Sequence, residues 1–269
     1  MRLSSARHPT CAPGSARYGT PGIAITWAGD ESRRVQAEEL AHELALPVVT
    51  PDNAGFELLL VCTPAHLELC DRRHPRIGPI YVDFSHLDLR PYSHNLSRRQ
   101  PLARAIGKKT RTVVDATAGY CQDALLLALM GFHVTAIERS PVVAALARDG
   151  LRRFTADTGT KLDQLLHFLD GDARTILPLT STRPDVIYLD PMFPAKRRKS
   201  AAVKKEMRVL RDLVGDDPDA LALLEISRRV ALDRVVVKRP DDAPPLAPGP
   251  SMSMPGKLVR YDVYLVKNP

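Results

Sequence analysis

Short apolar runs alternate with longer amphipathic stretches from Arg111 to the end of the chain. The runs are rich in β-branched residues and predict buried strands, whereas the stretches have the apolar spacing of helices. We expect strands at 112–116, 133–138, 165–171, 184–190 and 234–239, and helices at 121–131, 141–154, about 201–213 and 219–232. A Pro-rich loop at 241–250 precedes a final hairpin that turns near Pro255. This order predicts an α/β fold with a mostly parallel sheet and an antiparallel C-terminal hairpin.

The preceding residues show a shorter version of the same alternation. The expected elements are a strand at 23–27, a helix ending near Leu44, β-rich segments at 47–49, 56–63 and 80–84, and a short helix at 98–107. They predict a small N-terminal α/β appendage over 23–107, followed by the main domain over 108–269. Residues 1–22 contain arginines, no acidic residue and three prolines. We expect a disordered tail there rather than a transit peptide, because the prolines interrupt an amphipathic helix.

The composition excludes several classes of protein. Hydrophobic residues make up 44% and charged residues 26% of the 269, as in ordinary soluble globular proteins. No apolar run reaches the roughly 18–20 residues of a membrane-spanning helix. The four cysteines are scattered without a C-x-x-C pair, so the sequence indicates neither a zinc site nor a disulfide framework. We therefore expect no membrane and no metal partner.

Basic residues outnumber acidic residues by 38 to 31, which gives a formal charge of +7. Between 195 and 212 there are eight lysines and arginines but only two acidic residues. Such a local excess favours a polyanionic partner whose phosphates the segment would contact. The alternative is a solvated, charged face of a helix.

Acidic residues stand at the ends of four predicted strands. The segments concerned are DATAGYCQD at 115–123, Glu138, DGDA at 170–173 and DPMF at 190–193. In an open α/β sheet, ligands bind beyond the carboxyl ends of the strands, where the strand order reverses. Any one of these acids could simply cap the following helix. The four together favour a site for a nucleoside cofactor.

The first strand-to-helix turn distinguishes between cofactors. It contains one glycine, Gly119, whereas a pyrophosphate needs several glycines and a free helix N-terminus. Asp123 falls in the first helical turn, where a carboxylate repels phosphate and suits a cationic ligand. S-adenosylmethionine (SAM) has no phosphate and carries a sulfonium and an ammonium. Glu138 follows 23 positions after Asp115, about the spacing of an acid that binds ribose hydroxyls. These features favour SAM over the nicotinamide cofactor of a dehydrogenase.

The turn Asp190-Pro191-Met192-Phe193 suggests the methyl acceptor. A carboxylate and the carbonyls beside it can accept hydrogen bonds from an exocyclic amine of a nucleic-acid base. Phe193 could stack on that base once it leaves its helix. The alternative is a structural Pro turn with Phe193 in the core. We assign Asp190, Pro191 and Phe193 as the catalytic group.

Several long segments carry a resemblance to one family. They are VVDATAG at 113–119, IERSPVVAALARDGL at 137–151, YLDPMFP at 188–194, VKKEMRVLRDLVG at 203–215 and VVVKRPDDAPPLA at 235–247. Together with TPAHLEL at 63–69 and IYVDF at 80–84, they resemble the RsmJ family of small-subunit ribosomal RNA guanine-N2 methyltransferases. The resemblance implies a class I, Rossmann-like methyltransferase domain acting on a guanosine near the 3′ end of 16S RNA.

The resemblance also implies which residues contact the cofactor. By motif match these are Gln122, Asp123, Glu138, Arg139, Asp172, Ala173 and Asp190, to which the turn itself adds Gly119. The sequence departs from the family in two places. The first loop has Tyr120 and Cys121 where the family usually has Leu and Gly, and the glycine-rich basic stretch before the first strand is reduced to HNLSRRQ at 94–100.

The sequence thus predicts a cytoplasmic, SAM-dependent guanine-N2 methyltransferase whose partner is 16S ribosomal RNA or the small subunit. Two alternatives stay open. An Asp-Pro-x-aromatic turn can hold any exocyclic amine, so an adenine-N6 methyltransferase acting on RNA or DNA is one. A non-catalytic, RNA-binding ribosome-assembly protein whose altered loop no longer binds the cofactor is the other.

Overall fold

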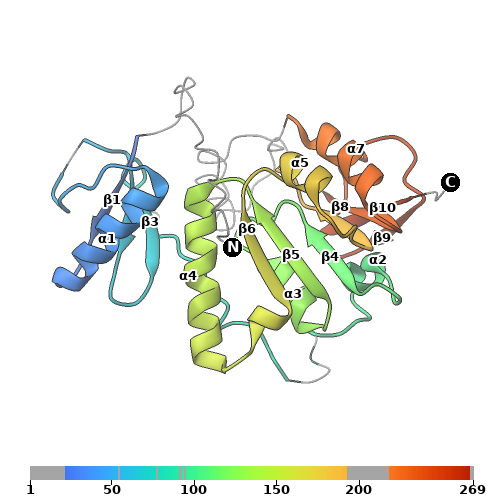
Figure 1. Cartoon of the computed structure of the whole chain (residues 1–269), viewed down its shortest axis with the longest axis horizontal. Coiled ribbons are helices and arrows are strands. Elements are labelled where there is room, and N and C mark those ends of the chain that lie inside the picture. The colour runs from blue at the N-terminus through green and yellow to red at the C-terminus, as the bar shows by residue number, and fades with distance from the viewer. Residues whose placement is uncertain are drawn as a thin grey trace, which may run out of the picture.

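Two β-sheets lie on opposite sides of the long helix α4 (Pro141–Thr158) (Figure 1). The computed structural model describes residues 22–53, 55–76, 78–90, 93, 95–192 and 218–266. Residues 1–21 of the predicted tail at 1–22 therefore lie outside the described residues, as do Phe193, the basic segment at 195–212 and the predicted helix at about 201–213. None of the helices within these ranges is long and apolar enough to cross a membrane.

The larger sheet has seven strands in the order β6-β5-β4-β7-β8-β10-β9. Its strands are β4 (Thr112–Asp115), β5 (His133–Glu138), β6 (Leu166–Asp170), β7 (Val186–Leu189), β8 (Arg234–Pro240), β9 (Met252–Pro255) and β10 (Val259–Leu265). β4 to β8 are parallel, and β10 runs antiparallel between β8 and β9. The predicted parallel sheet with an antiparallel hairpin is confirmed.

Helices cover this sheet as predicted from the alternating pattern. Besides α4 they are α2 (Pro101–Ile106), α3 (Gln122–Leu129), α5 (Ala173–Ile176) and α7 (Ala220–Val230), with short 3₁₀ turns at Leu162–Gln164 and Leu177–Leu179. α4 begins with Pro141 at its first position, and the Ser140 side chain accepts from the amide of Val143. All four residues of β7 are buried, as expected of a central parallel strand.

The strand order reverses between β4 and β7. Chain connections leave these neighbouring strands in opposite directions along the sheet, so their carboxyl ends flank a crevice. The fold therefore brings the predicted strand-end residues to a single edge.

The smaller sheet contains β1 (Ile23–Trp27), β2 (Leu58–Cys62) and β3 (Leu67–Asp71), with α1 (Glu31–Leu44) packed on it. β1 and β2 are parallel, and β3 is antiparallel to β2. The expected β-rich segment 80–84 forms one isolated bridge, from Ile80 to Leu69, rather than a strand. The sequence analysis did not predict β3, in which Asp71 stands in place of an apolar residue on the buried face of Leu67 and Leu69.

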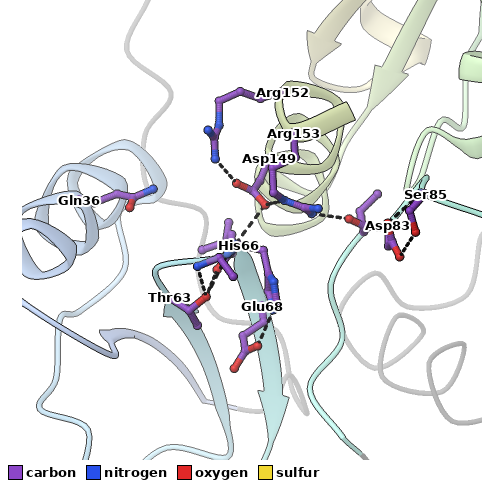
Figure 2. A network of polar contacts seen from close by, with 12 residues as sticks. Gln36, Thr63, His66, Glu68, Asp83, Ser85, Asp149, Arg152 and Arg153 are labelled. Atoms are coloured by element: carbon purple, nitrogen blue, oxygen red, sulfur yellow. Dashed lines mark hydrogen bonds and ion pairs between the residues drawn. The ribbon is translucent and has the colours of Figure 1, made fainter. Parts of the chain in front are cut away.

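The appendage is joined to α4 by a buried carboxylate (Figure 2). Asp149 accepts hydrogen bonds from the amide of Leu67 at 3.0 Å, from Arg153 Nε at 2.8 Å and from Arg152 Nη2 at 2.7 Å. Arg153 also donates to the carbonyl of Val82. Burial opposes the charge of Asp149, but the two arginines and the Leu67 amide outweigh it and lower the pKa of the carboxyl group. A boundary at residue 107 stays a prediction.

Candidate active site

A pocket lies beyond the carboxyl ends of the central strands, beside the point where the strand order reverses. It is lined by every predicted site residue that the structure describes: Gly119, Gln122, Asp123, Glu138, Arg139, Asp172, Ala173, Asp190 and Pro191. Phe193 lies outside the described residues. The pocket therefore brings together residues that are spread over more than seventy positions of sequence.

Glu138 fixes the loop that follows β4. One of its carboxylate oxygens accepts from the amide of Gly119 at 2.8 Å, and the other accepts from the amide of Ser140 at 2.8 Å. Gly119 has a φ of +53°, which glycine adopts without strain. A carboxylate has about four acceptor positions, so these two bonds are compatible with further bonds from ribose hydroxyls.

Cys121 occupies the position where the family usually has glycine. Its φ is +66°, in the left-handed region that non-glycine residues rarely adopt. The side chain is fully buried and packs in the core beside Ala118 and Ala124. Burial, with the nearby Asp115 and Glu138 carboxyls, raises the pKa of the thiol well above its usual value. The departure from the family pattern therefore places a non-glycine residue in a left-handed backbone and a buried thiol in the core, where burial keeps the thiol unreactive.

Charged side chains from three elements form one end of the pocket. Asp172 caps α5, and the Oδ2 atom of Asp172 is 2.5 Å from Nη2 of Arg174. Arg174 and Arg139 both bind Asp219, at 2.7 and 3.1 Å. The side-chain hydrogen bond from Arg174 lowers the pKa of Asp172, so this acid stays ionised. Arg174 and Asp219 were not predicted. Asp219 is the first residue of the predicted helix at 219–232, and Arg174 directly follows the segment DGDA at 170–173.

A lysine lies between two acids at the other end. Lys238 Nζ is 2.8 Å from Asp123 Oδ2 and 3.0 Å from Asp190 Oδ2. The hydroxyl of Tyr188 donates to the same Asp123 oxygen at 2.6 Å. Lys238 and Tyr188 were missed by the sequence analysis. The available signal was a lysine that directly follows the apolar run Val235–Val237 near the carboxyl end of β8.

The electrostatics of this end follow from burial and close charges. Burial opposes the charge of Lys238, but Asp190 and Asp123 outweigh it and raise the pKa of the ammonium. Asp115 is 1% exposed, and burial followed by the charge of Asp123 raises its pKa well above the usual range. Burial raises the pKa of Tyr261 to about 12, so the phenol stays neutral. Lys238 is therefore a permanent cation within an acidic cluster.

The residues present fit SAM. The two carboxylates of Asp123 and Asp190 outnumber the single charge of Lys238, so this end suits a ligand that carries a sulfonium and an ammonium. Glu138 suits ribose hydroxyls, and apolar side chains such as Ile137 and Leu223 line the walls near it. An acid in the first turn of α3 also disfavours a phosphate there.

The parallel sheet, with an acidic pocket at the point where its strand order reverses, defines a class I SAM-dependent methyltransferase. Residues 39–266 match the family model described as "Putative SAM-dependent methyltransferase". The chain is similar to proteins named ribosomal RNA small subunit methyltransferase J from Coxiella burnetii and Pectobacterium atrosepticum. The first is 43% identical over 91% of this chain and 97% of the relative, and the second is 49% identical over 81% and 90%.

A crystal structure of a SAM-dependent methyltransferase from Neisseria gonorrhoeae is also similar. Its TM-score is 0.67 and its identity 30%, over 91% of this chain and 97% of that one. The chain belongs to the ribosomal RNA small subunit methyltransferase J (RsmJ) family. The family resemblance, the fold class and the SAM cofactor predicted from sequence are confirmed.

Proposed function

We propose that this methyltransferase transfers a methyl group from SAM to the exocyclic N2 amine of a guanosine in 16S ribosomal RNA. The observation that carries the proposal is the position of Asp190, which follows β7 and lines the same pocket as the proposed cofactor residues. Its backbone amide donates to Thr117 Oγ1 at 2.6 Å, and its side chain remains 39% exposed. The names of the relatives support the choice of small-subunit RNA.

In this proposal, two groups of residues hold the cofactor. Glu138 and the loop at Gly119 bind the ribose, and Arg139, Asp172 and Ala173 surround the nucleoside end. Gln122 and Asp123 lie toward the opposite end, where acidic groups stabilise the positive charges of SAM. SAM supplies a methyl group already activated by the sulfonium. The main tasks of the protein are therefore alignment and stabilisation of the charge that develops on the amine.

Asp190 favours guanine over adenine in this arrangement. The Watson–Crick edge of guanine presents N1–H and N2–H, two adjacent donors, and an ionised carboxylate only accepts. Adenine presents N6–H beside the N1 lone pair, which would face a carboxylate oxygen. Asp190 and the carbonyl of Pro191 would hold the amine while its nitrogen attacks the methyl group and the methyl–sulfur bond breaks. The extra proton on the nitrogen would then pass to water. Phe193 would stack on the base, and the basic segment at 195–212 would contact phosphates.

The decisive experiment incubates the full chain with labelled SAM and small ribosomal subunits that lack the modification. Mapping the product by mass spectrometry should place N2-methylguanosine in 16S RNA. N6-methyladenosine would support the adenine alternative instead. No methylation, together with no SAM binding by calorimetry, would support a non-catalytic assembly protein. We further propose that the protein acts in the cytoplasm, where this substrate is found.

A further inference from the structure

Among the described residues at the acidic end of the pocket, Lys238 alone carries a positive charge. Neither cofactor binding nor the acceptor motif accounts for this charge. This inference rests on the proposed function: we propose that Lys238 is a positioning residue for methyl transfer. It holds Asp190 as an ionised, acceptor-only carboxylate in one orientation, ready for the two donors of the guanine edge.

The strand register places the two residues side by side. Leu189 of β7 pairs with Val237 of β8 in the last step of their parallel ladder. Asp190 and Lys238 are the next residue of each strand segment, so they meet at the mouth of the pocket. The 3.0 Å contact between Nζ and Oδ2 is a charge-assisted bond of ordinary length.

The orientation of Lys238 is fixed from several sides. Asp123 holds the ammonium from α3 at 2.8 Å, and Tyr188 in turn donates to Asp123 from β7. Tyr261 of β10 is the direct cross-strand neighbour of Lys238. The Lys238 side chain is 23% exposed and that of Asp123 is 19% exposed, so the pair is largely shielded from water. Because the ammonium is held in one place, it stabilises one position of the Asp190 carboxylate.

The charges explain why such a cation is needed. The groups that face Lys238 are Asp123 from α3, Asp115 from β4, Asp190 directly after β7 and Tyr261 from β10, while Tyr188 of β7 donates to Asp123. Carboxyl groups that share one site favour protonation of one another. Without the ammonium, proton uptake would convert Asp190 from an acceptor into a donor. A protonated Asp190 repels one of the two guanine donors, so the methyl acceptor would be misplaced.

A purely structural role for Lys238 makes different predictions. In that case its removal would lower the melting temperature and the fraction of active protein, but the remaining protein would show the wild-type dependence of rate on pH. A positioning role changes the pH profile of the folded enzyme. The two roles are therefore separable by single-turnover kinetics.

The test compares wild type with Lys238→Met, Lys238→Arg and the double variant Lys238→Met/Asp123→Asn, using Lys161→Met on the exposed surface as the matched control. Single-turnover methyl transfer to unmodified small subunits is measured from pH 5.5 to 9, beside SAM affinity and melting temperature. We expect the rising limb of the Lys238→Met profile to shift to higher pH by roughly one to three units, which is the effect of one opposite charge on the pKa of a carboxyl group at this distance. Below that limb its rate should fall about tenfold per pH unit.

Lys238→Arg should keep the wild-type pH profile, even at a lower maximal rate. The double variant should move the profile back toward wild type, because one carboxylate has been removed with the cation. A wild-type profile in Lys238→Met would overturn the proposal, as would an equal loss of rate at every pH.

A second measurement does not depend on the RNA. Carbon-detected NMR follows protonation of the Asp190 carboxyl group in wild type and Lys238→Met, and we expect it at higher pH in the variant. Coincident titrations would also overturn the proposal. If wild type leaves small-subunit RNA unmethylated, the proposed substrate is wrong, and the NMR titration alone decides whether Lys238 keeps Asp190 ionised.

Discussion

The carboxylate of Glu138, at the end of β5, accepts a 2.8 Å hydrogen bond from the amide of Gly119, in the loop that follows β4. The residue proposed to bind the ribose therefore also sets the shape of the loop that would lie against the cofactor. Loss of this carboxylate should affect both.

We expect Glu138→Gln to weaken SAM binding by about 10- to 100-fold. Glutamine has one acceptor oxygen for the amides of Gly119 and Ser140 and for the ribose, so a ribose hydroxyl loses its charged acceptor, and such a bond contributes about 1.5–3 kcal/mol. Isothermal calorimetry measures the affinity. Glu39→Gln, on the exposed face of α1, serves as the control. Equal affinities in the two variants would remove Glu138 from the cofactor site.

Asp190→Ala should lower kcat by about 10²–10³, the usual effect of removing one hydrogen-bond partner from a transition state. The contact with the amine strengthens as the nitrogen gains positive charge, so its loss acts mainly on turnover. RNA affinity should change little, because phosphate contacts supply most of it. Single-turnover transfer and melting temperature are measured together, with Asp157→Asn on the outer face of α4 as the control. A stable Asp190→Ala variant with near-normal transfer would disprove the assignment.

The basic segment gives a separate test of the RNA partner. Replacing Arg197, Arg198 and Lys199 with alanine should weaken RNA binding and leave SAM affinity unchanged. Each lost phosphate contact should reduce the slope of log K against log salt by up to about 0.9. Filter binding across a salt series measures the slope. An unchanged slope would mean that these side chains form only a solvated face.

Cys121 should respond differently to glycine and to alanine. Both substitutions remove the buried sulfur, but only glycine relieves the left-handed backbone at φ +66°. We expect Cys121→Gly to be more stable than Cys121→Ala by about 1 kcal/mol, the cost of a non-glycine residue in this region. Urea denaturation measures the difference. A more stable alanine variant would show that the backbone at this position carries little strain.

The lowered pKa of the Asp149 carboxyl group predicts that the stability of the protein depends on pH. The pKa of this carboxyl group is lowered in the folded protein, so its contribution is complete above the unfolded value near 3.9 and is lost as pH falls through the lower, folded value. Asp149→Asn should therefore destabilise the protein at pH 7, by about 3–5 kcal/mol if the loss is that of a broken buried ion pair. The difference from wild type should shrink as the pH falls below 4. Urea denaturation at several pH values measures it, and a pH-independent difference would contradict the role assigned to the charge.

The sequence was sufficient to predict the main sheet and one side of the site. The apolar run at 133–138 coincides with β5, and the strand-end rule located Glu138 and Asp190 because parallel strands end at a common edge. The role of Lys238 could not be predicted in this way. Its role depends on the register between β7 and β8 and on the placement of Asp123 by α3, which are set by packing across the sheet.

Arg98 shows the same limit for a basic residue. It belongs to the stretch HNLSRRQ that replaces the family's basic segment before the first main-sheet strand. In the structure its guanidinium donates twice to the carbonyl of Met130, at 3.0 and 2.7 Å, and lies 4.4 Å from the ring centre of Phe132. It closes the C-terminal end of α3, where a cation is favourable. Local sequence does not reveal that partner, because it lies 32 positions away.

Helix α4 packs against both sheets and joins them. On one side its apolar residues Val142, Leu146 and Phe154 belong to the same core as Leu69 of β3, and at Gly150 a β-carbon would collide with Val82. A chain cut at residue 107 would expose that face of α4 to water, at a cost of about 25 cal/mol for each Å² of apolar surface. We therefore expect residues 108–269 expressed alone to be less stable than the full chain.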